Sequence, residues 1–547
     1  MREAPGQGPG DRPGEGPGSL PRLQRSGDAT QLVVDGAPFL VRGGELGNSS
    51  AERAHLRSSW PKLEALGLNT VVAPVRWDLV EPVEGTFDWS SVDELVEDVQ
   101  EHRMRLVVLW FGTWKNSMSC YAPDWVKSDV DRFPRCRTST GEPLEMLTPF
   151  STANRDADAR VFAALMRHLR EHDRRHTVVL VQVENEIGMI PEARDRSPEA
   201  EAAFTSSVPA ELLAHVREHG GRLAPELAPA WEALASTGGG SWGDALGEGP
   251  ATDELFMAWH FARYVQAVVE AGKAELDLPM YTNAALVRPG ALPGQYPSAG
   301  PLPHLVDVWR AGAPSLDFIA PDIYFPDFAG WAGRYARTGD PLFVPEALRS
   351  VDAAANALYA YGAHSAIGFS PFGIESIEGD AAELLAAAND VVRQLTPLMT
   401  AHAGDGRMTG LLPPADDMRT PHRVRVGEVV LDVTYERQSA PSLADGVINE
   451  AGDRSTDGRR LPAGAVVVRT GQDELVVGGI GVTITFSPTQ LGQERVGILS
   501  CEEGRFDEDG AWRHLRWLNG DETHQGRHVR LPPGRMTVQR VRLYRYR

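Results

Sequence analysis

Eight short apolar runs, separated by longer stretches with helical periodicity, constrain the fold of this chain more than any other feature. Runs rich in β-branched residues that alternate with amphipathic helical patterns are typical of parallel βα units. Eight such runs over about 350 residues predict an α/β fold, a closed (β/α)8 TIM barrel enlarged by insertions. The eight candidate strands lie at residues 38–45, 68–75, 105–112, 177–186, 279–284, 316–324, 341–347 and 365–372.

Composition and hydrophobic patterning divide the chain into three parts. The barrel is expected at residues 31–417, with an insertion at about 190–250 over the barrel mouth. Short alternating strands separated by turns predict a C-terminal antiparallel β-sandwich domain at residues 418–547. Residues 1–30 are rich in glycine and proline and contain no apolar run, so we expect a disordered arm without a signal peptide.

Charge and composition exclude several classes of partner. The net charge is −21, from 54 basic and 75 acidic residues, and no basic stripe interrupts this acidic background. Nucleic acid and anionic membranes are therefore unsuitable partners. Because no stretch of about 18 apolar residues occurs, we expect no membrane span and a cytoplasmic location. The three cysteines, Cys120, Cys136 and Cys501, form no CxxC pair, and a bridge between the first two stays open.

Acidic residues stand at the ends of two candidate strands that are otherwise apolar. The fourth strand ends in Glu184, Asn185 and Glu186, and the seventh ends in Glu346. A barrel gathers reactive groups at the carboxyl ends of its strands, so carboxyls from these two strands can face one central pocket. Cleavage of a glycosidic bond with retention needs two carboxyls about 5 to 5.5 Å apart. The pattern predicts Glu186 as acid/base and Glu346 as nucleophile.

Polar and aromatic residues at the strand ends are candidates for sugar contacts. Asn185 is placed to hydrogen-bond the sugar 2-hydroxyl, a contact that strengthens in the transition state. Aromatic faces and polar forks are the groups that bind sugars in such pockets. The further substrate-binding candidates are Glu45, Arg76, Trp77, Trp110, Trp114, Asn116, Tyr324, Phe372 and Glu375.

Three stretches resemble glycoside hydrolase family 35 of clan A, in its bacterial branch with a short β-rich C-terminal domain, which includes β-galactosidases. They are WDLVEPVEGTFDWS at 77–90, VQVENEIG at 181–188 and GPLPHLVDVWRAGAPSLDFIAPDIY at 300–324. The resemblance implies the same acid/base, Glu186, and the same nucleophile, Glu346. Family 42 of the clan shares the Asn-Glu arrangement, so the choice between the two families stays open. Both imply the same reaction class.

The function predicted from the sequence is removal of terminal β-D-galactose from oligosaccharides or plant polysaccharide side chains. Two alternatives stay open: a retaining β-glycosidase for a glucoside, mannoside or glucuronide, and a non-catalytic carbohydrate-binding barrel. No cofactor or metal is expected, because no HxH pair stands at a strand end and no glycine-rich loop follows a strand. The oligomeric state is open, with a homodimer among the options.

Overall fold

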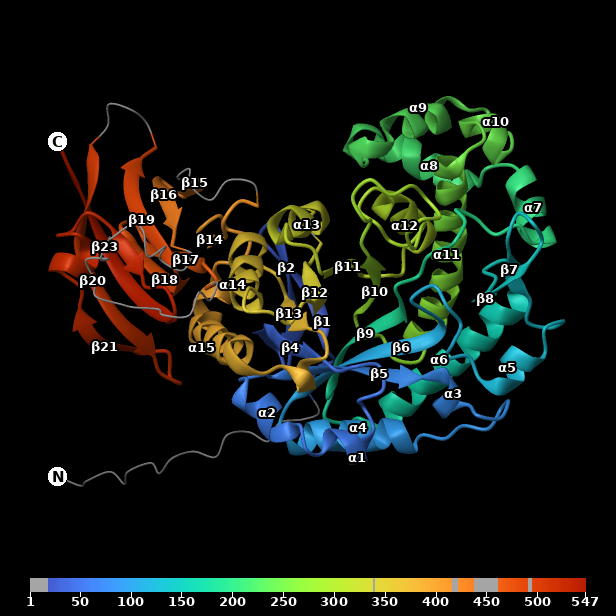
Figure 1. Ribbon diagram of the computed structural model, residues 1–547, viewed down its shortest axis with the longest axis horizontal. Coiled ribbons are helices and arrows are strands. Elements are labelled where there is room, and N and C mark those ends of the chain that lie inside the picture. The colour runs from blue at the N-terminus through green and yellow to red at the C-terminus, as the bar shows by residue number, and fades with distance from the viewer. Residues whose placement is uncertain (1–17, 338–339, 416–421, 437–460, 490–493) are drawn as a thin grey trace, which may run out of the picture.

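The eight predicted strands close into one parallel barrel in the computed structural model, which describes residues 18–337, 340–415, 422–436, 461–489 and 494–547 (Figure 1). Around the barrel the strand order is β10-β11-β12-β13-β4-β5-β6-β9. The prediction of a (β/α)8 barrel is confirmed. The barrel strands are β4 (Val41–Glu45), β5 (Thr70–Arg76), β6 (Arg105–Lys115), β9 (Val178–Asn185), β10 (Met280–Ala285), β11 (Phe318–Ile323), β12 (Phe343–Ala347) and β13 (Gly368–Pro371).

Helices surround the barrel and bury its outer face. Side chains that point outward from the strands pack on these helices in one large core, whereas a second buried cluster, including Val72, Leu109 and Phe343, fills the barrel interior. The main helices between and after the strands are α2 (Trp60–Ala65), α4 (Ser90–Glu101), α6 (Thr152–His172), α11 (Pro250–Lys273), α12 (Val306–Gly312), α13 (Phe328–Tyr335), α14 (Ala353–His364) and α15 (Gly379–Ala401). Shorter elements are α1 (Arg53–Leu56), α3 (Trp77–Val80), α5 (Asp124–Ser128), β7 (Arg135–Arg137) and β8 (Pro143–Leu147).

The insertion between the fourth and fifth barrel strands forms four short helices. They are α7 (Pro198–Thr205), α8 (Ala210–His219), α9 (Ala228–Ser236) and α10 (Trp242–Leu246). Helix α8 packs on α12, and α10 packs on α11. Figure 1 shows α8, α9 and α10 gathered at one edge of the molecule. The insertion packs on outer helices of the barrel, and its buried apolar side chains, such as Trp231 and Trp242, belong to the outer core. Its expected position over the barrel mouth stays a prediction.

The segment before the barrel is partly structured, which corrects the expected arm at residues 1–30. Residues 1–17 lie outside the described residues. Strands β1 (Arg22–Ser26), β2 (Ala29–Val34) and β3 (Ala37–Phe39) form a small antiparallel sheet. Leu32 and Val34 of β2 belong to the buried cluster of the barrel interior, and this burial holds the sheet in place.

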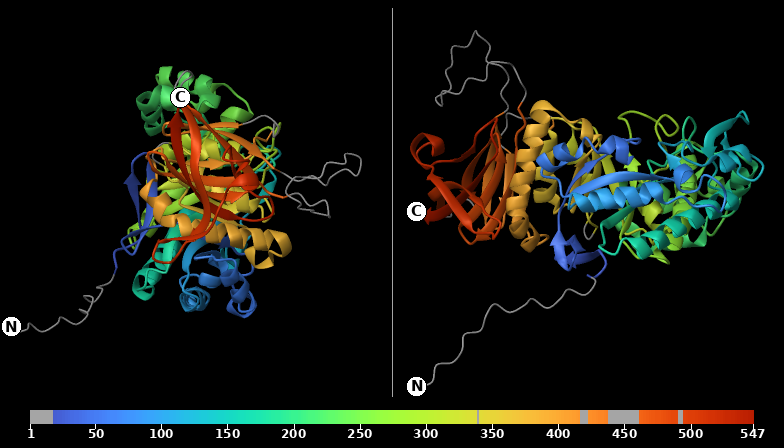
Figure 2. Two further views of the ribbon diagram at one scale, coloured as in Figure 1. Left: turned by 90° about the vertical axis from the view of Figure 1, so that its left-hand side faces the viewer. Right: turned by 90° about the horizontal axis from the view of Figure 1, so that it is seen from below.

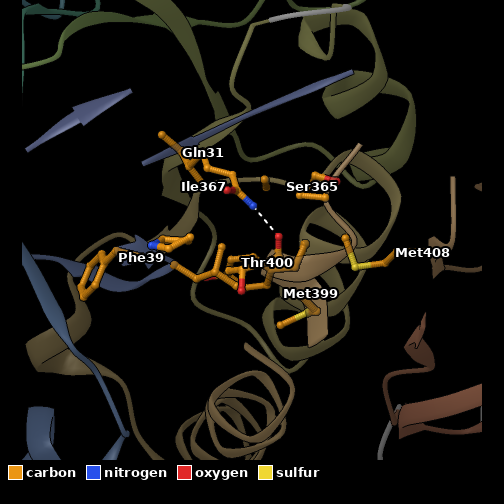
Figure 3. Close-up of a pocket in the computed structure, with 12 residues that line it drawn as sticks. Gln31, Phe39, Ser365, Ile367, Met399, Thr400 and Met408 are labelled. Carbon is orange, nitrogen blue, oxygen red and sulfur yellow. Dashed lines mark hydrogen bonds between the residues drawn. The ribbon is translucent and has the colours of Figure 1, made fainter. Parts of the chain in front are cut away.

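The small sheet contacts α15 at the amino ends of the barrel strands. The Gln31 amide donates a hydrogen bond to the carbonyl oxygen of Thr400 over 2.6 Å (Figure 3). The cavity beside it, lined by Phe39, Met399 and Met408 among others, holds only about 10 Å³. A cavity of this size is at the lower limit for a single water molecule, so it has no room for an organic ligand.

Two antiparallel sheets form the C-terminal domain, and the predicted sandwich is confirmed. Residues of both sheets, including Val433 and Val477, share one buried cluster. The six-stranded sheet contains, in order, β14 (Met408–Leu411), β17 (Gly464–Gly471), β18 (Glu474–Ile480), β23 (Thr537–Tyr546), β20 (Arg495–Phe506) and β21 (Trp512–Trp517). The four-stranded sheet contains β15 (His422–Val426), β16 (Val429–Tyr435), β19 (Val482–Pro488) and β22 (Val529–Leu531).

The boundary between the barrel and the sandwich lies earlier than the predicted residue 418. Strand β14 pairs with β17 and so belongs to the sandwich sheet, although it precedes residue 418. The run is only four residues long, too short for its alternation to separate it from the end of a helix. Figure 2 shows the sandwich stacked on the α14 and α15 side of the barrel.

The helices and the three cysteines bear on the predictions about membrane spans and disulfides. Among the helices that the structure describes, none combines the length and the apolar character that a membrane span requires. Cys120, Cys136 and Cys501 are free thiols, so the bridge that the sequence left open between the first two is absent.

Close backbone contact between α14 and β14 fixes the sandwich against the barrel. A Cβ atom added at Gly362 would lie 2.6 Å from the Thr409 carbonyl oxygen, and one added at Gly410 would lie 2.4 Å from the Tyr359 carbonyl oxygen. Glycine at both positions therefore allows a helix and a strand to approach more closely than any larger residue permits.

We expect Gly362→Ala to destabilise the protein by about 1–3 kcal/mol, because the added methyl group separates α14 from β14. The matched control is Gly333→Ala on α13, where no atom lies within 4 Å of the added Cβ. Alanine is the better helix former, so the control is expected to be neutral or stabilising. Chemical unfolding of both variants measures the difference, and equal free energies of unfolding would contradict this account of the interface.

Candidate active site

Three buried carboxyl groups meet at the carboxyl ends of the barrel strands. Glu186 directly follows β9, Asp322 lies in β11 and Glu346 lies in β12. One carboxylate oxygen from each lies within 4.8 Å of the oxygens of the other two. Their exposed fractions are 8%, 2% and 3%. The structure thus brings together the two glutamates chosen from the sequence and adds Asp322 as a third carboxyl.

Asn283, at the end of β10, connects these groups and was not among the predicted site residues. Its Oδ1 accepts a hydrogen bond from the Glu186 backbone N–H at 2.9 Å, and its Nδ2 donates to Asp322 Oδ2 at 2.6 Å. Asn283 lies near the carboxyl end of a short strand, as Glu346 does, so the strand-end criterion that found Glu346 also applies to it. The amide holds the backbone of Glu186 in a left-handed conformation, with φ of 44°.

Burial raises the pKa values of all three carboxyls, and repulsion between carboxylates adds to this for Asp322 and Glu346. Burial, followed by the charge of Glu186, raises the pKa of Glu346 to about 7, while Lys115 and a hydrogen bond from Tyr324 act in the opposite direction. Burial also raises the pKa of Glu186, against the charge of Lys115. For Asp322, burial and the charge of Glu346 raise the pKa well above its ordinary value. The cluster therefore holds protons at a pH where isolated carboxyls are ionised.

Lys115 supplies the positive charge of the cluster and orients Asn185. The ammonium group is buried and donates to Asn185 Oδ1 at 2.8 Å. Because Oδ1 is occupied, Asn185 presents its Nδ2, a buried atom without a protein partner, as a donor. Asn116 Nδ2 donates to Glu186 Oε2 from the loop after β6. Both predicted asparagines thus lie beside the carboxyl groups.

Further buried polar atoms around the carboxyl cluster are without a protein hydrogen-bond partner. Among the described residues these include Glu45 Oε1, Asp322 Oδ1 and the Tyr281 hydroxyl. Burial, followed by the charge of Glu346, raises the pKa of Glu45 well above its usual range. The charge of Glu45 in turn helps to raise the pKa of the Tyr281 phenol, after burial. Unsatisfied buried polar atoms are costly, and a ligand rich in hydroxyl groups can satisfy them.

The same three carboxylates are the described residues whose oxygens lie close enough to share a metal ion. Lys115 already compensates charge in this cluster, since its ammonium lowers the pKa of Glu186, Asp322 and Glu346. A bound cation would have to compete with this buried ammonium group. The donor set alone therefore gives no specific indication of a metal centre.

Three tryptophans expected to contact sugar are core residues instead. Trp77, Trp110 and Trp114 are completely buried. Their indole N–H groups donate within the protein, to Glu81, Asp158 and the Leu147 carbonyl respectively. These residues face the helical layer, where no ring face is open to a ligand. Trp110 alternates with the interior residues Leu109 and Phe111 and so points outward from β6, where the packed helices cover it.

The other predicted contacts divide between the cluster and its rim. Tyr324 is 39% exposed and hydrogen-bonds Glu346. Glu375 accepts a hydrogen bond from the Gly47 backbone N–H at 3.2 Å, so it fixes the loop after β4. The remaining two predicted contacts, Arg76 and Phe372, are partly buried at strand ends. Arg76 forms an ion pair with Asp78 at 2.7 Å, and the backbone of Phe372 forms a parallel β-bridge with that of Glu45.

Two segments of the chain match the sequence models of known families. Residues 31–215 match the sequence model of glycosyl hydrolases family 35. Residues 385–530 match a domain of unknown function (DUF5597), which covers α15 and most of the sandwich. The resemblance to family 35 is therefore confirmed on the first half of the barrel, which carries Lys115, Asn185 and Glu186.

Two curated relatives carry the name β-galactosidase. The chain is 40% identical to a beta-galactosidase of Xanthomonas manihotis over 72 residues, which is 13% of this chain and 12% of the relative. It is 26% identical to beta-galactosidase-1-like protein 3 of Homo sapiens over 182 residues, 33% of this chain and 26% of the relative. The matches thus span about a quarter or less of each relative's length.

Solved structures with a similar chain path include two bacterial β-galactosidases. That of Marinomonas ef1 matches with a TM-score of 0.46 and 14% identity, over 65% of this chain and 60% of the other. The cold-adapted enzyme of Rahnella sp. R3 matches with a TM-score of 0.45 and 16% identity, over 65% of this chain and 56% of the other.

The raised pKa of Glu346 predicts that this residue costs stability at alkaline pH. A carboxyl with a pKa near 7 in the folded chain and 4.5 when unfolded favours folding below pH 4.5, and this contribution is lost as the pH rises to 7. We expect Glu346→Gln to be more stable than wild type by about 3 kcal/mol at pH 8 and by little at pH 4. Unfolding at both values measures this; the exposed Glu101→Gln is the control, and a pH-independent difference would contradict the prediction.

Proposed function

We propose that this protein is a retaining glycoside hydrolase that releases terminal β-D-galactose, with Glu186 as acid/base and Glu346 as nucleophile. The observation that carries the proposal is the approach of their carboxylate oxygens to within 4.8 Å in one buried cluster. This separation fits a direct attack on the sugar, because inverting enzymes keep their carboxyls about 6.5–9.5 Å apart to admit a water molecule. The names of the two curated relatives support galactose as the sugar.

In the first step Glu346 attacks the anomeric carbon while Glu186 gives its proton to the glycosidic oxygen. The bond to the leaving group breaks, and a galactosyl ester forms on Glu346. Glu186 suits the acid role because burial raises its pKa, and Asn116 orients its carboxyl. Glu346 is assisted as a nucleophile by Lys115 and Tyr324, which both favour its ionised form.

In the second step Glu186, now ionised, removes a proton from water as the water oxygen attacks the anomeric carbon. The ester bond to Glu346 breaks, its carboxylate is regenerated, and galactose leaves with retained configuration. Asn185 presents its Nδ2 to the sugar 2-hydroxyl throughout, because the Lys115 ammonium fixes its amide. This contact is expected to strengthen in the transition state.

The electrostatics of the cluster favour a neutral sugar among the alternatives. Glu45, Asp322 and the two catalytic glutamates surround a single buried ammonium group, that of Lys115. A uronic acid would place a further carboxylate among them, at a cost that grows in a poorly solvated site. We therefore favour a galactoside, glucoside or mannoside over a glucuronide. Both carboxyls needed for catalysis are present, which speaks against a non-catalytic carbohydrate-binding barrel.

We expect wild type to hydrolyse an aryl β-galactoside and Glu346→Gln to lose at least about a thousandfold in kcat. Azide added to Glu346→Gly is expected to restore turnover and to yield the α-galactosyl azide, because azide replaces the missing nucleophile. A panel of aryl glucosides, mannosides and glucuronides tests the sugar. Equal activity of wild type and Glu346→Gln would refute the assignment, and galactoside binding without turnover by wild type would favour the binding-barrel alternative.

We expect kcat/KM to decrease toward acidic pH with a midpoint near pH 7, because Glu346 must be ionised to attack the sugar. Tyr324→Phe removes a hydrogen bond that favours the ionised form, so its acidic midpoint should shift upward. A pH profile of both proteins measures the shift. A midpoint at pH 4–5 in both would contradict the proposed environment of Glu346.

A further inference from the structure

The conformation of Glu184 differs from the one that strand alternation predicts. Alternation would place Glu184 and Glu186 on one face, but both have left-handed backbone conformations, with φ of 61° and 44°. Glu184 is completely buried outside the carboxyl cluster. Its Oε2 accepts a hydrogen bond from the Trp114 backbone N–H at 2.6 Å, and its Oε1 accepts one from Thr113 at 3.2 Å. Glu184 thus binds the backbone of β6 where that strand bulges.

A second buried carboxyl, Asp158 of α6, lies directly beside Glu184. A Cβ atom added at Gly112 would lie 2.8 Å from both Asp158 Oδ1 and Glu184 Oε1, so the two oxygens face the same point of the backbone. Asp158 Oδ1 also accepts from the Trp110 indole at 2.9 Å, and Oδ2 accepts from the Thr113 hydroxyl at 2.7 Å. Asp158 is therefore surrounded by donors, as an ionised carboxylate would be.

The pair carries at most one negative charge for a physical reason. Asp158 from α6 and the Tyr264 phenol from α11 are the titratable groups that face Glu184, and neither brings a positive charge. Two adjacent carboxylates in a dry site repel each other strongly, so one of them retains a proton. Burial, followed by the charge of Asp158, raises the pKa of Glu184 well above its ordinary value.

We propose that Glu184 is a neutral positioning residue that keeps its proton, donates a hydrogen bond to Asp158 and, through the backbone of β6, holds the side chains that contact the acid/base. The residues it fixes, Thr113 and Trp114, immediately precede Lys115 and Asn116. Asn116 donates to Glu186, and Lys115 donates to Asn185. Glu184 itself does not touch the substrate. The catalytic part of this inference rests on the proposed function.

A glutamine tests the protonation state of Glu184 because it copies the neutral acid. In Glu184→Gln the amide NH2 donates to Asp158 and the carbonyl accepts from Trp114, at the loss only of the longer 3.2 Å hydrogen bond from Thr113. Glu184→Ala removes all three contacts. A carboxyl whose pKa is raised by folding loses stabilisation as the pH rises above its unfolded value, and the glutamine does not. We expect the Tm of Glu184→Gln to exceed that of wild type by about 1–3 °C at pH 8. The difference should shrink toward pH 5, and Glu184→Ala should melt below wild type at both values.

This melting experiment measures no activity, so it decides the protonation state even if the proposed function fails. The matched control is Glu101→Gln, at an exposed carboxyl, which should show no growing difference with pH. A Tm difference between Glu184→Gln and wild type that stays constant from pH 5 to pH 8 would overturn the neutral state. So would a glutamine variant that is as unstable as the alanine variant.

The positioning role is tested by the dependence of activity on the leaving group. A poor leaving group such as 4-methoxyphenol needs protonation by Glu186, whereas 2,4-dinitrophenol needs little. We expect Glu184→Ala to lose at least about tenfold more kcat/KM on the poor galactoside than on the good one. Asn116→Ala should show the same pattern, and Glu184→Gln should retain at least about half of the wild-type value on both. If Glu184→Ala lost kcat/KM equally on the two substrates, the positioning role would be refuted and Glu184 would be a purely structural residue.

Discussion

Closure of the parallel sheet into a barrel is the constraint on which the candidate site depends. Strands β9, β11 and β12 are separated by long stretches of sequence, yet closure directs their carboxyl ends toward one axis. Glu186, Asp322 and Glu346 therefore meet in one largely buried cluster. Burial raises their pKa values, repulsion between carboxylates adds to this at Asp322 and Glu346, and Lys115 acts in the opposite direction.

Around this cluster the protein places stabilising interactions where they do not compete with a ligand. Asn283 holds the backbone of Glu186, and Lys115 holds the amide oxygen of Asn185, so the Glu186 carboxyl and the Asn185 Nδ2 stay free of these two contacts. The unsatisfied polar atoms of Glu45, Asn185 and Asp322 are a local cost in free energy. The apolar core between the barrel and its helices offsets this cost, as is usual where a site is built for a polar ligand.

The ends of β6 and β9 show how far the site departs from regular strand geometry. Left-handed residues occur in both segments, at Asn116, Ser117, Glu184 and Glu186. Such conformations cost on the order of 1–3 kcal/mol each and persist where surrounding contacts impose them. Here the Glu184 and Asp158 pair on one side, and Asn283 on the other, supply those contacts. Because of these left-handed conformations, Glu184 binds the backbone of β6, whereas Glu186 joins the carboxyl cluster.

The sequence by itself determined the eight strands, the sandwich and the pair Glu186 and Glu346, because strand periodicity and strand ends are local properties of the chain. Only the tertiary structure decided that Trp77, Trp110 and Trp114 belong to the core, since their rings are covered only once the outer helices have packed on the barrel. The same holds for contacts between residues far apart in the chain. Asn283 reaches Glu186, and Glu184 reaches Asp158, only after the barrel has closed and its helices have packed.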